Sequence, residues 1–83
     1  MHTEVSPRIL LTGASGFIGK RLLYRLDELG LQVRCLVRRP ERLKLPYPLK
    51  NPPEIVTGDL SNPASLERAL EGIDAAYYLV HSM

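Results

Sequence analysis

Residues 10–19 read LLTGASGFIG, and this stretch decides the fold because three evenly spaced glycines join a strand pattern to a helical one. The apolar run at 8–12 follows Pro7 and is typical of a strand that is buried on both faces. After Gly16 the apolar residues recur at helical spacing as far as Leu29. We therefore expect a strand, a glycine turn and a helix, which is how a backbone is shaped to approach a pyrophosphate.

The predicted helix has one apolar face. Its members are Ile18, Leu22, Leu26 and Leu29. Charged side chains, Asp27 among them, fall largely off this face, and Gly30 stands where a helix C-terminal glycine belongs. The side chains of Phe17 and Ile18 are expected to pack, whereas their amides face the ligand.

Three further strand patterns and a second helix follow along the chain. The strands are predicted at 33–37, 54–57 and 75–80, and the helix at 64–70. Ser61 or Asn62 can cap this helix, and Pro63 is pre-shaped for its first turn. Residues 40–53 contain prolines through which no helix continues beyond a first turn or two, so an irregular, proline-rich crossover is expected there.

The alternation of strands and helices predicts the fold class. It indicates an α/β protein with a Rossmann-type parallel sheet, helices on both faces and the spatial strand order 3-2-1-4. A full doubly wound sheet has more strands than the four expected here. Residues 1–83 are therefore expected to be a truncated N-terminal dinucleotide-binding half-domain.

Composition argues against several other classes of function. Eleven basic and nine acidic residues give a net charge of +2, too small to indicate nucleic-acid binding. No apolar run approaches ~20 residues, so no membrane span is predicted. The N-terminus lacks the layout of a secretion signal, so a cytoplasmic location is expected. Cys35 should be a buried, inert thiol, and no histidine–cysteine cluster has metal-ligand spacing.

Each glycine of the loop has a separate expected task. Gly13 permits the tight turn out of the strand, Gly16 leaves room for phosphate oxygens, and Gly19 lets the helix pack close to the sheet. The helix N-terminus adds unpaired amides and a partial positive charge. The expected cofactor contacts in this loop are Gly13, Ser15, Gly16, Phe17, Ile18 and Gly19.

Residues 12–19, TGASGFIG, resemble the cofactor loop of the short-chain dehydrogenase/reductase superfamily, in its extended and atypical branches. Residues 58–60, GDL, resemble a second marker of these families, and the tail 77–83 is similar to NmrA-like NAD(P)-binding members. The resemblance implies that Asp59 and Leu60 lie near the adenine. Asp59 can equally be a turn or helix-entry residue. The resemblance also implies that His81 lies near the path of the nicotinamide ribose, and the alternative is an ordinary strand-end histidine.

The end of the second predicted strand bears on the choice of cofactor. An NAD-selective site places an acid there, about 20 residues beyond the glycine loop, to bind the ribose hydroxyls. This chain has Arg38 and Arg39 instead, which suit a ribose 2′-phosphate. NADP(H) is therefore favoured, with NAD as the alternative. The two arginines can also be a solvated strand end, and Arg38 can stack on the adenine.

The resemblance implies catalysis by a Tyr-x-x-x-Lys pair, and no tyrosine here has a lysine four positions later. No catalytic residue is therefore assigned, and the 83-residue chain alone is expected to be inactive. The parent is interpreted as an NAD(P)-dependent oxidoreductase or epimerase. The alternative is a non-catalytic NmrA-like sensor of the dinucleotide or an accessory subunit. Self-association through the open edge of the strand at 75–80 is also expected.

Overall fold

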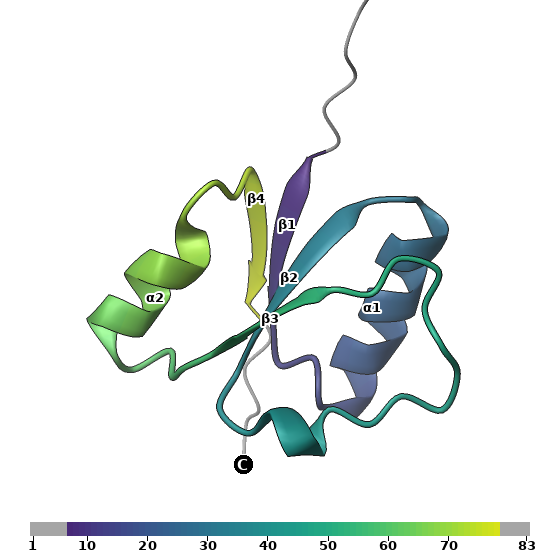
Figure 1. Ribbon diagram of the computed structural model, residues 1–83, viewed down its shortest axis with the longest axis horizontal. Helices are drawn as coiled ribbons and strands as arrows, with labels where there is room; N and C mark the ends of the chain where they lie inside the picture. The colour runs from purple at the N-terminus through teal and green to yellow at the C-terminus, as the bar shows by residue number, and fades with distance from the viewer. Residues whose placement is uncertain (1–6, 79–83) are drawn as a thin grey trace, which may run out of the picture.

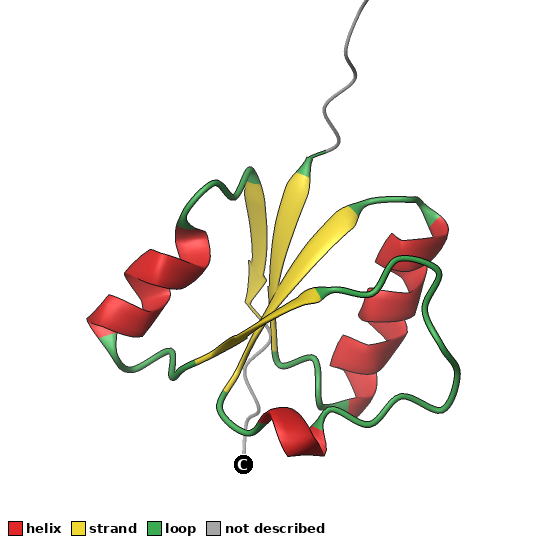
Figure 2. Ribbon diagram, in the orientation of Figure 1, coloured by secondary structure: helices red, strands yellow, loops and turns green. Residues whose placement is uncertain are grey.

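The computed structural model describes residues 7–78, which form a parallel sheet with helices on both faces (Figures 1 and 2). The sheet order is β3-β2-β1-β4, which confirms the predicted α/β fold and its strand order. In Figure 1, α1 lies to one side of the sheet and α2 to the other. The elements are β1 (Arg8–Thr12), α1 (Phe17–Glu28), β2 (Gln32–Val37), the 3-10 turn η1 (Pro40–Arg42), β3 (Glu54–Thr57), α2 (Pro63–Leu70) and β4 (Ala75–Tyr78).

The strand register brings the carboxyl ends of the strands to one edge. Thr12 pairs with Leu36 of β2 and with Tyr78 of β4, and Val37 pairs with Thr57 of β3. The loops that follow β1, β2 and β3 therefore leave the sheet side by side. This is the lower end of the sheet in Figure 1, where α1 begins and η1 lies.

Two apolar layers hold the helices on the sheet. Alternate residues of a strand face opposite sides, so Ile9 and Leu11 pack on the α1 side whereas Leu10 packs on the α2 side. The α1 layer is the larger one. Its buried members are Ile9, Leu11, Ala14, Leu23, Leu26, Val33, Cys35 and Val37.

The face of α1 that packs on the sheet differs in part from the predicted one, since Leu22 and Leu26 pack against the core as predicted but Ile18 and Leu29 do not. Ile18 and Leu29 are 68% and 59% exposed, whereas Gly19, Leu23 and Leu26 are buried. The sequence contains two overlapping apolar patterns at helical spacing. Close contact of Gly19 with the loop before the helix fixes its rotation and selects the second pattern.

Asp27 was predicted to lie off the packed face, and this was also wrong: it is only 7% exposed. Its carboxylate accepts hydrogen bonds from the amides of Lys50 and Asn51, both at 2.8 Å. The Lys50 amide is the main cause that lowers the pKa of Asp27 from its ordinary value of 3.8. Asp27 thus anchors the far end of the proline-rich crossover to α1, a role that depends on residues 23 positions away.

A tyrosine pair makes a second attachment between α1 and the crossover. The Tyr24 hydroxyl accepts a hydrogen bond from the Tyr47 amide at 2.8 Å and donates one to the Tyr47 carbonyl. The two rings meet edge to face with centroids 6.2 Å apart. The crossover has no regular element between η1 and β3, yet it is held against α1 at both of these points.

On the other face, Arg34 of β2 connects three elements. Its Nε donates to Glu54 of β3 at 2.8 Å, and its Nη1 donates to the Ala69 and Glu71 carbonyls at 2.8 and 2.6 Å. The start of α2 is fixed by Asn62, whose side chain accepts from the Ala64 amide. Of the two predicted caps, Asn62 is therefore the one that the fold uses.

Candidate functional site

The turn that follows β1 requires a glycine at position 13. Gly13 has φ = 75°, a conformation that side chains with a Cβ rarely adopt. Its carbonyl accepts the Gly16 amide at 3.1 Å, which closes a tight turn directly before α1. The predicted role of Gly13 as the turn glycine is consistent with this geometry.

Gly19 sets how closely the helix approaches the loop. A Cβ at this position would stand 1.9 Å from the Gly13 carbonyl oxygen and 2.9 Å from the Ala14 Cα. Both opposing atoms are backbone, so no side chain can move aside. The glycine at position 19 therefore keeps the first turn of α1 pressed against the loop that precedes it.

The N-terminus of α1 presents free amide donors. The first intrahelical bond runs from the Lys20 amide to the Gly16 carbonyl at 2.9 Å, so the amides of residues 17–19 have no partner within the helix. Gly16 has no side chain to cap them, and no acidic residue stands in the first turn. These donors and the helix dipole together favour an anion such as a phosphate group.

The side chains beside these amides do not pack in the core, contrary to the prediction. Phe17 is 74% exposed and Ile18 is 68% exposed. The Arg21 guanidinium lies over the Phe17 ring, 5.6 Å from its centroid. The rotation of α1 that buries Gly19 turns positions 17 and 18 outward.

A surface cleft lies beside the glycine loop, at the carboxyl end of β2. It combines Ser15 of the loop with three arginines from the segment after the strand. Its lining residues are Ser15, Val37, Arg38, Arg39 and Arg42. Sequence reasoning proposed the first two arginines and missed Arg42. Pro40 was a usable signal for Arg42, because proline favours the first position of a helical turn. Such a turn brings the chain back toward the end of β2.

Asp59 lies in the turn after β3, one residue beyond Gly58. Its carboxylate accepts the Ser61 amide at 3.0 Å, which makes it the turn residue that one of the two sequence interpretations described. This amide is the main cause that lowers the pKa of Asp59, and the charge of Arg38 adds to the effect. Leu60 beside it is partly exposed. His81 lies outside the described residues.

Gly58 is required for packing. A Cβ there would come within 2.7 Å of the Ser65 hydroxyl of α2. The Gly58 amide also donates to the Val37 carbonyl at 2.9 Å, which continues the β2–β3 pairing into the loop. The segment that contains Asp59 is thereby held next to the arginines after β2.

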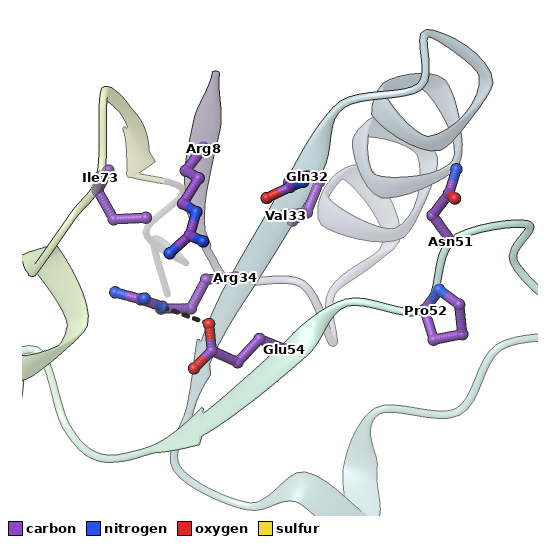
Figure 3. A pocket seen from close by; sticks show the side chains of 8 residues that line it. All are labelled: Arg8, Gln32, Val33, Arg34, Asn51, Pro52, Glu54 and Ile73. Atoms are coloured by element: carbon purple, nitrogen blue, oxygen red, sulfur yellow. Dashed lines mark hydrogen bonds and ion pairs between the residues drawn. The ribbon is translucent and has the colours of Figure 1, made fainter. Parts of the chain in front are cut away.

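A second pocket, of about 220 Å³, lies at the opposite edge of the sheet (Figure 3). Arg8, Gln32 and Glu54, which line it, are the first residues of their strands. The charge of Arg34 in this pocket is matched by Glu54, and its Nη1 donates to two backbone carbonyls. We therefore interpret the cluster as a structural connection between β2, β3 and α2.

Other chemistry has little support in the described part of the chain. Burial raises the pKa of the Cys35 thiol to about 12, so it is protonated and unreactive at neutral pH. Residues 7–78 contain no group of three or more histidine, cysteine or acidic side chains that could hold a metal ion. Within the same range, no helix has the length and apolar character that crossing a membrane requires.

The fold and the loop together define a dinucleotide-binding Rossmann domain. The sequence profile of the family described as NAD(P)H-binding matches residues 13–82, which is most of the chain. The chain belongs to this NAD(P)H-binding family.

The proteins to which this chain is similar include a reductase and a Rossmann-fold NAD(P)-binding protein. The (4-alkanoyl-5-oxo-2,5-dihydrofuran-3-yl)methyl phosphate reductase of Streptomyces griseus is 41% identical over 88% of this chain and 24% of its own length. A Rossmann-fold NAD(P)-binding family protein from Shigella flexneri superposes with a TM-score of 0.79, at 28% identity over 94% of this chain and 39% of that one.

A third relative is a short-chain dehydrogenase/reductase superfamily protein from Agrobacterium tumefaciens with bound NAD. It superposes with a TM-score of 0.71, at 29% identity over 92% of this chain and 21% of that one. The resemblance to this superfamily is thus confirmed. The chain spans about a quarter of the length of the curated relatives it matches, 24% of the first two.

Proposed function

We propose that this chain is the cofactor-binding part of an NADP(H)-dependent oxidoreductase of the short-chain dehydrogenase/reductase type. The observation that carries the proposal is the cleft that Ser15 lines together with Arg38 and Arg39. These arginines occupy the end of β2, where an NAD-selective member has a carboxylate for the ribose hydroxyls.

The pyrophosphate would bind at the N-terminus of α1. The amides of residues 17–19 supply the donors, and Gly16 leaves space in front of them. From there the adenosine half extends toward the ends of β2 and β3. A 2′-phosphate on its ribose would meet guanidinium groups, which donate paired, charge-assisted hydrogen bonds to phosphate oxygens.

When bound, the nicotinamide cofactor supplies a hydride to the substrate. In this proposal residues 7–78 position the cofactor, and the groups that transfer a proton to the substrate belong to the rest of the parent protein. The reductase among the relatives supports an oxidoreductase over the non-catalytic alternative.

The test is a comparison of NADPH and NADH binding by calorimetry, with Arg38→Ala beside the unchanged chain. We expect the chain to prefer NADPH by roughly tenfold or more, the scale of one charge-assisted hydrogen bond. Arg38→Ala should reduce this preference and leave NADH binding unchanged. Equal affinity of the unchanged chain for both cofactors would refute the proposed NADP(H) preference.

A further inference from the structure

The turn η1 brings a third arginine into the cleft beside the glycine loop. The Arg42 amide donates to the Arg39 carbonyl at 2.9 Å, and the Leu43 amide donates to the Pro40 carbonyl at 3.0 Å. These two bonds fold the chain back directly after β2. As a result Arg42 lines the same cleft as Ser15.

The side chains that line this cleft carry positive charge that no acidic side chain in the lining balances. Arg38, Arg39 and Arg42 all line it and all are exposed. Glu41 belongs to the same turn but does not line the cleft. Asp59, in the loop after β3, interacts electrostatically with Arg38. Asp59 therefore offsets part of the Arg38 charge, whereas no acidic side chain lines the cleft beside Arg39 and Arg42.

We infer that Arg42 is a specificity-determining residue that binds the 2′-phosphate of the cofactor together with Arg38, Arg39 and Ser15. This inference deepens the proposed function and rests on it. A doubly charged phosphate is bound most strongly by several guanidinium donors, and Asp59 offsets part of the charge of Arg38, which is one of the three arginines in the cleft. Arg42 supplies a further planar donor fork from η1, the turn that follows the end of β2.

The chain offers a matched control for this role. Lys44 is two residues further along, is exposed and has the same charge, but it does not line the cleft. Arg42→Gln and Lys44→Gln therefore remove one positive charge each from the same segment. Only the first removes donors from the cleft, so the pair separates direct contact from long-range attraction.

The experiment measures the affinities of NADPH, NADH, 2′,5′-ADP and 5′-AMP for the unchanged chain and for three variants, Arg42→Gln, Arg42→Lys and Lys44→Gln. We expect Arg42→Gln to weaken NADPH and 2′,5′-ADP by roughly tenfold and to leave NADH and 5′-AMP within about twofold. Arg42→Lys should retain part of the preference because it keeps the charge and loses the planar fork. Lys44→Gln should change all four ligands little.

Three results would overturn the inference. If the unchanged chain prefers NADPH but Arg42→Gln keeps the same preference, the role of Arg42 is refuted and the proposed function stands. If Lys44→Gln matches Arg42→Gln, the effect is general electrostatics. If the unchanged chain binds NADPH and NADH equally, the proposed NADP(H) preference fails and the role of Arg42 fails with it. Arg42→Lys keeps the test decisive should the glutamine variant fold poorly.

Discussion

The substitution Gly19→Ala should separate the helix from the glycine loop and abolish tight cofactor binding. The added Cβ would stand 1.9 Å from the Gly13 carbonyl oxygen, whereas real Cβ atoms essentially never come closer than 3.0 Å to another heavy atom. The first turn of α1 must then move by about 1 Å, because the opposing atom belongs to the backbone.

Two effects of opposite sign set the size of the stability change. Alanine is the better helix former by about 1 kcal/mol. Overpacking against an unyielding neighbour costs about 1–3 kcal/mol and occasionally more. The upper end applies here because no side chain can relieve the contact, so we expect a net loss of about 2 kcal/mol or more in the free energy of unfolding.

The assay combines urea unfolding followed by circular dichroism with NADPH titration. Gly30→Ala is the matched control, since it strains a residue at φ = 75° with nothing within 4 Å of the added Cβ. That strain costs about 1–2 kcal/mol but lies at the other end of α1. Cofactor affinity should fall at least tenfold in Gly19→Ala, the scale of one lost amide–phosphate bond, and should be retained in Gly30→Ala. A Gly19→Ala chain with unchanged stability and affinity would refute the reasoning.

Three other outcomes follow from described contacts. Asp27 has a lowered pKa in the folded state, so the stability that it contributes is present at neutral pH and is lost as the pH falls from about 4 through that pKa. Over this range the urea midpoint should therefore fall less steeply with decreasing pH in Asp27→Asn than in the unchanged chain. Identical slopes for the two chains would contradict the anchoring role of Asp27. Cys35 should resist a thiol reagent in the native protein and react once urea unfolds it, whereas fast labelling without denaturant would show the thiol to be accessible. The outer edge of β4 has no partner strand among the described residues, so sedimentation should show self-association that grows with concentration, and a monomer at all concentrations would count against this edge as an interface.

Local patterns were sufficient to predict much of the fold. Strand β1, the turn at Gly13 and the order of the sheet follow from apolar periodicity and from the glycine spacing. These features depend on neighbours in the sequence or on general rules of chain connection. The position of Arg38 and Arg39 beside the glycine loop was predicted in the same way, because a fixed spacing separates the loop from the end of β2.

Features that depend on distant residues were not predicted. The rotation of α1 is set by a backbone contact between Gly19 and Gly13, and two apolar faces were compatible with the same periodicity. The burial of Asp27 depends on amides 23 and 24 positions away. Arg42 is a different case, because the turn η1 that brings it into the cleft is local and Pro40 indicated that turn, but hydrophobic spacing alone does not give the direction of a short turn.

Arg34 has a consequence for how the domain assembles. Its side chain is 10% exposed, and the two carbonyls that accept from its guanidinium lie 35 and 37 residues later, at the end of α2. Until α2 docks, that cation needs water, and removing the water without those acceptors is unfavourable. The α2 face of β2 therefore cannot exclude water before α2 docks on it, whereas the α1 face can. Pairing of β3 and docking of α2 should then occur as one cooperative step, so that amide hydrogens in both segments exchange with solvent at a common rate while those of β1 are protected separately.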